Sequence, residues 1–167
     1  MSWFEFLASD IPMDDLENAR ALRLSVGEAV KRGLNAPDTV LRAADIESPE
    51  AFLWFEKRED LYEIEIKEML PFMRTNGKDV FPVVDLLHFS SLNWEYTDER
   101  ARQLIEYVRT HLEKAGVVEL WGYWAGMDTD RSKSRRREIR VDALTPEYLA
   151  SVCIESPYDY DCIVILP

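Results

Sequence analysis

The longest regular pattern in the sequence is the stretch "TDERARQLIEYVRTHLEKAG", residues 97–116. Its apolar residues recur three and four positions apart, which is the spacing of one face of an α-helix. Thr97 or Asp98 can cap the start of this helix, and Gly116 can end it. A helix with one apolar face has to bury that face against another layer of structure. The apolar stripe comprises Ala101, Leu104, Ile105, Val108 and Leu112.

The segments around this helix show the period of β-strands. In "LYEIEIKEML" the apolar residues Tyr62, Ile64 and Ile66 alternate with charged residues, which indicates a half-buried strand. A second strand is predicted over 79–89, "DVFPVVDLLHF", and we expect it to pair with the first. The last segment, "DCIVILP", is apolar on both faces and is expected to be an interior strand. The three strands after the helix are predicted at 117–127, 137–144 and 161–167.

Three further helices are predicted. One covers 14–32, with acids at its start and Gly33 at its end. One covers 48–58, where Pro49 stands at the first helical position. A short one covers 145–152.

These elements follow one another in the order α-α-β-β-α-β-β-α-β. That order predicts an α+β fold, with a single mixed or antiparallel sheet of about five strands covered by helices. The 167 residues fit one globular domain over 1–167, because a chain of this length buries enough surface to fold without disulfides or metals.

The first twelve residues carry two acids and no basic residue, so they do not resemble a signal peptide. No stretch approaches the ~20 apolar residues of a membrane helix. We therefore expect a cytoplasmic protein that makes no contact with a membrane. Its two cysteines, Cys153 and Cys162, are expected to be reduced there, although the sequence leaves open whether they pair.

Charge is distributed unevenly along the chain, whose net charge is −12. Residues 131–140 hold six basic residues against the single acid Glu138, a net charge of +5, so the other residues sum to −17. A body this acidic repels nucleic acid and acidic membranes, and it attracts basic partners. Acids also serve solubility alone.

The basic loop is expected at the tip of a hairpin between the strands at 117–127 and 137–144. A calcium-binding loop is excluded, because basic residues stand between the oxygen-bearing side chains that would bind the ion, and their positive charge would repel it. Nucleic-acid contact through 131–140 is an alternative that the acidic body disfavours. Two other interpretations of the loop remain. In the first its charges are solvated, and Arg136 and Arg140 pair with acids on the sheet. In the second the loop contacts a partner protein, or a second copy in a homodimer. The loop residues are Arg131, Lys133, Arg135, Arg136 and Arg137.

Sequence motifs for catalysis are absent. There is no nucleophile elbow, glycine-rich phosphate loop or zinc-binding motif, and we predict no metal and no cofactor. His88 and His111 are interpreted as structural, since a nearby serine alone does not make a catalytic triad. The many carboxylates leave a small carboxylate- or metal-dependent hydrolase as an alternative.

Tyrosines and tryptophans interleave with acids in two stretches, 89–99 and 155–161. Such a mixture suits contact with a basic protein, because the rings supply contact area and the acids steer the approach. The sequence therefore favours a non-enzymatic acidic protein-binding domain, such as an immunity or inhibitor protein that neutralises a basic toxin or nuclease. The candidate partner-binding residues are Trp94, Tyr96, Asp98, Glu155, Tyr158, Asp159, Tyr160 and Asp161.

Overall fold

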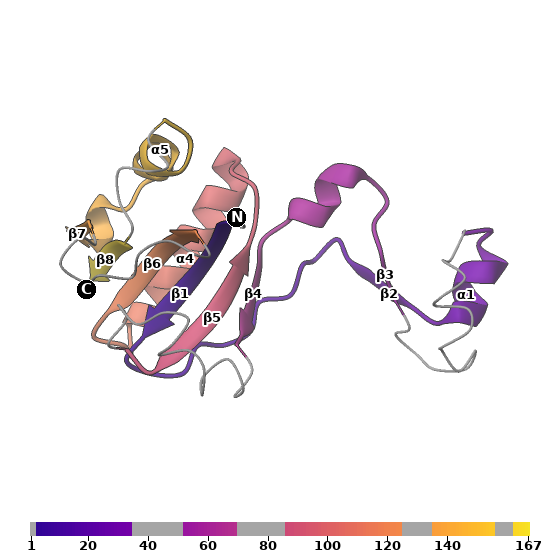
Figure 1. Cartoon of the computed structure of the whole chain (residues 1–167), viewed down its shortest axis with the longest axis horizontal. Helices are drawn as coiled ribbons and strands as arrows, with labels where there is room; N and C mark the ends of the chain where they lie inside the picture. The colour runs from indigo at the N-terminus through magenta and orange to yellow at the C-terminus, as the bar shows by residue number, and fades with distance from the viewer. Residues whose placement is uncertain (1–2, 35–51, 70–85, 125–134, 156–161) are drawn as a thin grey trace. The chain divides into compact units, whose positions relative to one another are not determined.

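The computed structural model describes residues 3–34, 52–69, 86–124, 135–155 and 162–167, and Figure 1 shows their elements. The chain divides into two compact units. The larger unit consists of Met1–Glu17 and Ile64–Pro167, and the smaller unit of Asn18–Glu63. The expectation of a single globular domain stays a prediction. Among the described residues, no helix is both long and apolar enough to span a membrane.

Six described strands of the larger unit form one sheet, in the order β4-β5-β1-β6-β8-β7. Neighbouring strands are antiparallel except β7 and β8, which are parallel, so the sheet is mixed and the fold is α+β. The predicted count of about five strands was too low, because the first strand was not predicted. The strands are β1 (Trp3–Ser9), β4 (Glu65–Glu68), β5 (His88–Asn93), β6 (Val118–Trp124), β7 (Arg136–Arg140) and β8 (Cys162–Leu166).

Strand β1 lies between β5 and β6 and is buried on both faces. On one face Leu7 belongs to the larger core cluster. On the other face the Phe6 ring stacks on Trp121, with centroids 5.9 Å apart and planes inclined by 1°. Strand β8 is buried in the same way from Cys162 to Ile165, which confirms that the last apolar segment is an interior strand. Strands buried on both faces lack polar alternation, and β1 was missed for that reason.

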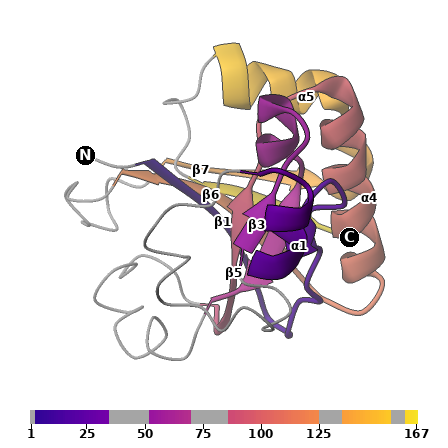
Figure 2. The ribbon, with the colours of Figure 1, turned by 90° about the vertical axis from the view of Figure 1, so that its right-hand side faces the viewer.

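Helix α4 (Asp98–Leu112) confirms the predicted helix, and its whole apolar stripe is buried. The Thr97 side chain caps it by accepting a hydrogen bond of 3.2 Å from the Arg100 amide. The predicted short helix is also present, as α5 (Pro146–Ala150) with Thr145 as its cap, followed by the π-helical turn η4 (Ser151–Glu155). Figure 2 shows α4 and α5 on the same side of the sheet.

The predicted hairpin between β6 and β7 is wrong. Strand β8 lies between them, and β7 runs parallel to β8. Parallel neighbours need a crossover connection rather than a tight turn. The described part of that connection is the 3₁₀ turn η3 (Val141–Ala143), α5 and η4. Residues 128–134 of the expected hairpin tip lie outside the described residues, and Arg136 and Arg137 belong to a strand at the edge of the sheet.

The smaller unit corrects the predicted helix over 14–32. Only α1 (Val26–Lys31) is helical, and the strand β2 (Leu22–Leu24) precedes it. Ser25 and Glu28 form a capping box that starts the helix, a local signal that the apolar spacing obscured. The predicted stop is confirmed, because Gly33 has a φ of 70°, which favours glycine.

The predicted helix over 48–58 is also wrong within the described residues. Strand β3 (Phe52–Trp54) pairs with β2 instead, and the 3₁₀ turn η1 (Arg58–Tyr62) follows. Aromatic residues favour strands over helices. In the larger unit β5 starts only at His88, near the end of the predicted 79–89 strand, whose residues 79–85 lie outside the described part. Its predicted pairing with the preceding strand is confirmed, since β4 and β5 are antiparallel neighbours.

A buried carboxylate, Glu119 of β6, occupies the face of the sheet that carries Phe6 and Trp121. The Trp121 indole Nε1 donates a hydrogen bond of 2.8 Å to Glu119 Oε2. The Arg136 guanidinium forms an ion pair with the other oxygen, Oε1, and lies 5.4 Å from the centre of the Trp121 ring. The interpretation that Arg136 pairs with an acid on the sheet is therefore confirmed.

We expect Glu119→Ala to lower the free energy of unfolding by about 2 kcal/mol, because it leaves the buried Trp121 N–H without an acceptor and removes the partner of Arg136. Glu119→Gln keeps an acceptor for Trp121 and should cost about half as much. Urea denaturation of both variants checks this. Equal losses would show that the Trp121 hydrogen bond contributes nothing.

Candidate protein-binding surface

The first predicted group of partner-binding residues lies together around the start of α4. Trp94 is only 9% exposed, and its Nε1 donates to Glu5 Oε2 at 2.9 Å, so its ring belongs to the core. Tyr96 is half-buried, and its hydroxyl lies 3.0 Å from both Asp98 Oδ1 and the Pro146 carbonyl oxygen. Asp98 is exposed. Tyr96 and Asp98 therefore supply most of the solvent-facing part of this group, and their binding role stays a prediction.

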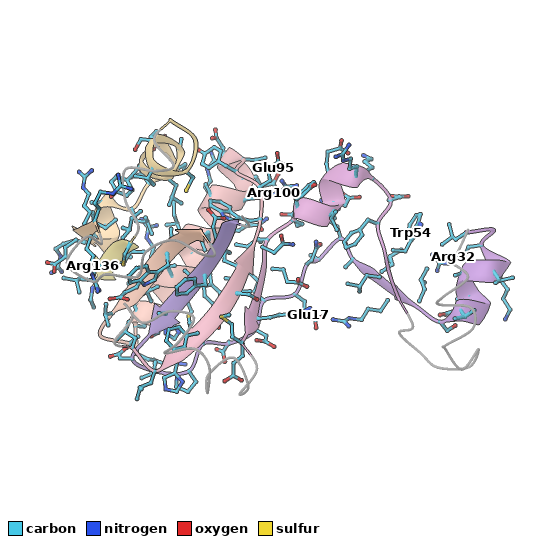
Figure 3. All side chains as sticks on the ribbon, in the orientation of Figure 1. Glu17, Arg32, Trp54, Glu95, Arg100 and Arg136 are labelled. Carbon is cyan, nitrogen blue, oxygen red and sulfur yellow. The ribbon has the colours of Figure 1, made fainter. Side chains whose placement is uncertain are left out.

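The second predicted group falls mostly outside the described residues. Glu155 ends η4, and its side chain is not described, while Tyr158, Asp159, Tyr160 and Asp161 lie outside. The basic loop is divided in the same way. Arg131 and Lys133 lie outside the described residues, whereas Arg135, Arg136 and Arg137 are exposed at the β7 edge, where Figure 3 labels Arg136.

A different acidic surface follows β1, and we call residues 10–17 the acidic segment. It contains four acids and no basic residue. Met13 is buried, and Ile11 and Leu16 are half-buried against the same core as α4. The acids point the other way, and all four are exposed: Asp10, Asp14, Asp15 and Glu17.

Hydrogen bonds hold the acidic segment to two elements of the larger unit, β4 and α4. The amides of Leu16 and Ile66 each donate to the other residue's carbonyl at 2.8 Å, which fastens the segment to β4. Next to this bridge, Asp15 Oδ1 accepts a hydrogen bond of 2.8 Å from the Glu68 amide. On α4, the Tyr107 hydroxyl donates to the Asp14 carbonyl at 2.6 Å. The backbone of the segment is thus fixed before any partner binds.

Asp10 is held by Gly116, two residues before β6 begins. Its Oδ1 and Oδ2 lie 3.2 and 3.0 Å from the Gly116 amide nitrogen, which donates to them. Burial alone would raise the pKa of Asp10, but hydrogen bonds, above all those from backbone amides with Gly116 first, outweigh it and hold that pKa below its ordinary value. A Cβ at Gly116 would lie 2.9 Å from Asp10 Oδ2. Gly116 was predicted as the helix stop, but α4 ends earlier, at Leu112 with Glu113 as its cap, and a larger residue at 116 would displace the Asp10 carboxylate.

Two rings of α4 lie beside these acids. Tyr107 and His111 stack with their centroids 6.5 Å apart and their planes inclined by 2°. Burial, together with the carboxylates of Asp14 and Asp15, raises the pKa of Tyr107 to about 12, so its hydroxyl stays protonated and donates. The half-buried rings add flat contact area beside the exposed carboxylates.

Ser9 and His111 resemble a nucleophile and its base, since Ser9 Oγ lies 2.8 Å from His111 Nε2. Ser9 Oγ also lies 3.1 Å from the Val117 carbonyl oxygen, which can only accept, and 3.4 Å from the Ile11 amide, which can only donate. The single hydroxyl proton goes to one of two groups that can only accept, the Val117 carbonyl or Asp10 Oδ1 at 3.3 Å, so His111 Nε2–H donates to Ser9 in either case. Ser9 is fully buried. This arrangement favours a structural hydrogen bond over an activated nucleophile.

Other candidate nucleophiles and bases are equally unsuited. Burial raises the pKa of Cys153 to about 12, which leaves its thiol protonated and unreactive. Cys162 is buried, and neither cysteine is in a disulfide. His88 pairs with Ser9 across β1 and β5, and its buried Nδ1 has no hydrogen-bond partner among the described residues. It lies two residues from Ser90, which is buried in the sheet.

We predict a pH dependence of stability from His111. Burial lowers its pKa below the ordinary 6.5, with Lys114 acting in the same direction and Asp10 and Asp14 against it. The folded protein therefore binds this proton less tightly than the unfolded chain. The corresponding stability is complete above 6.5 and is lost as the pH falls through the folded pKa.

Urea denaturation from about pH 7.5 to about pH 5 tests this. The wild type should lose stability in that window, and His111→Gln should lose less. Imidazole NMR should show the neutral Nε2–H tautomer near neutral pH. A neutral Nδ1–H tautomer would contradict the hydrogen-bond assignment and would restore Ser9 as a possible nucleophile.

No group of three or more His, Cys, Asp or Glu residues in the described part of the chain is placed to hold a metal ion. No family model, curated protein or solved structure matches the chain.

Proposed function

We propose that the chain is a protein-binding domain whose acidic segment binds a basic partner. The observation that carries this proposal is the fixed backbone of residues 10–17, which displays four exposed acids and no base. A surface that is already ordered loses little conformational entropy on binding. Its charges steer a basic partner and accelerate association.

The finer version of the proposal is an immunity or inhibitor protein that neutralises a basic toxin or nuclease. A cleft that binds a phosphate backbone is lined by basic side chains. Carboxylates at fixed positions can occupy that cleft in place of phosphates, and the stacked Tyr107 and His111 can cover it with apolar area. Such an inhibitor needs no catalytic site of its own.

The test begins with an affinity pull-down from the native cell at low and at high salt, with mass spectrometry to identify what is retained. We expect one basic protein at low salt and less of it at high salt. That protein is then purified, and its association and dissociation rates with the chain are measured.

The double variant Asp14→Asn, Glu17→Gln should slow association with this partner by about tenfold at low salt and change dissociation little, because it removes steering charge. The matched control is Glu138→Gln, Asp142→Asn, which removes two exposed acids elsewhere in the larger unit. If the control slows association equally, the net charge of the chain steers the partner and the acidic segment has no specific role. If neither variant has an effect, the proposal is wrong.

A further inference from the structure

Strand β7 is the last strand of the sheet, and no described strand pairs with its outer side. The opposite edge strand, β4, differs, because the bridge between Leu16 and Ile66 covers its outer side. Outer edges of sheets display backbone donors and acceptors that can template another strand. Among the described strands, β7 therefore displays such groups along its outer edge.

The register shows which backbone groups of β7 point outward. The Cys162 amide donates to the Arg135 carbonyl, and Arg136 is aligned with Cys162 in the parallel pair. In a parallel ladder, alternate residues direct both backbone groups to the same neighbour. Arg137 and Ile139 therefore bond toward β8, while the N–H and C=O groups of Arg136, Glu138 and Arg140 point to the outer side.

The side chains of β7 carry a net charge of +2, three arginines against Glu138. Arg136 and Arg137 are exposed, yet both are held in place on opposite faces of the strand. Arg136 pairs with Glu119 over the Trp121 ring, and the Arg137 guanidinium lies 5.3 Å from the centre of the Tyr148 ring. Arg140 is exposed as well, and Glu138 is the only acid of the strand.

We infer that the outer edge of β7 accepts an extended acidic segment of another protein as a seventh strand. Backbone hydrogen bonds would supply affinity, and the arginines would select acids at the facing positions. Opposite charges on directly facing strand residues are stabilising, and like charges are destabilising. A second β7 from another copy would set arginines against arginines, so charge complementarity favours an acidic partner. This inference does not depend on the acidic segment.

The probe is a fluorescent peptide with the core Glu-Val-Lys-Glu-Glu. In antiparallel register it places acids opposite Arg136, Arg137 and Arg140, and its lysine opposite Glu138. Fluorescence anisotropy with the full chain should show saturable binding. A peptide of the same sequence, N-methylated at the amides that face β7, should bind at least about tenfold more weakly, because it keeps the charge but loses hydrogen bonds.

The decisive variant is Glu138→Pro. The Glu138 N–H points outward, so proline removes a donor from the outer edge without breaking a bond to β8. We expect at least about tenfold weaker peptide binding, with an unchanged melting temperature. Arg140→Glu should also weaken binding, and its matched control Arg109→Glu on α4 should not. If Glu138→Pro unfolds the chain, the test rests on the wild type alone, by comparing its binding of the N-methylated and the unmodified peptide.

Other occupants give different results. Equal binding of the N-methylated peptide would show attraction by charge without strand addition, and would overturn the inference. A dimer in sedimentation experiments that Glu138→Pro converts to a monomer would assign the edge to a second copy instead. A single-stranded oligonucleotide that displaces the peptide and binds Glu138→Pro undiminished would assign the arginines to nucleic acid.

Discussion

Burial of β1 on both faces is the constraint on which the rest of the larger unit depends. Through Leu7 the strand joins the core beneath α4, and through Phe6 it joins the aromatic cluster on the other face. Its partners β5 and β6 come from far along the chain. Where β1 ends, Ser9 and Asp10 contact α4 and the start of β6. The position of this strand therefore fixes where the acidic segment begins.

The sequence correctly predicted those elements whose ends and buried faces are marked by residues within or next to the element. Helix α4 has a complete apolar stripe and a threonine cap, so local sequence alone marks its start and its buried face. Strand β8 was also correctly placed inside the sheet. The order of strands was not accessible in the same way. The pattern of β6 and β7 fits a hairpin, and only tertiary packing inserts β8 between them. An interior strand such as β1 lacks the alternation that marks a half-buried one.

The candidate binding surfaces also depend on tertiary contacts that the sequence pattern does not reveal. Trp94 was predicted as a binding residue from its acidic neighbourhood, yet its ring packs in the core and Glu5 of β1 accepts its N–H. The sequence pattern of residues 14–17 was interpreted as the start of a helix, whereas the acidic segment is anchored by contacts far along the chain. Asp10 and Gly116 are 106 positions apart, and Asp15 and Glu68 are 53 apart. Contacts at such separations leave no periodic signal.

The acidic segment runs from the end of the interior strand β1 to one edge of the sheet, where Leu16 bonds to β4, and the arginines belong to β7 at the opposite edge. Five strand spacings separate these edges by roughly 24 Å. That distance is about three times the Debye length of about 8 Å at physiological salt. The two surfaces therefore do not neutralise each other, and each presents its own charge to solvent despite the net charge of −12.

This separation also bears on self-association. If the basic edge of one copy bound the acidic segment of another, each pair would leave one basic edge and one acidic segment unused. A contact between two different surfaces closes only when its rotation forms a ring, and otherwise it propagates into a filament. Self-repulsion between chains of net charge −12 opposes such growth. The two separate partners that we propose, a basic protein for the acidic segment and an acidic strand for β7, would satisfy both surfaces in an assembly of limited size.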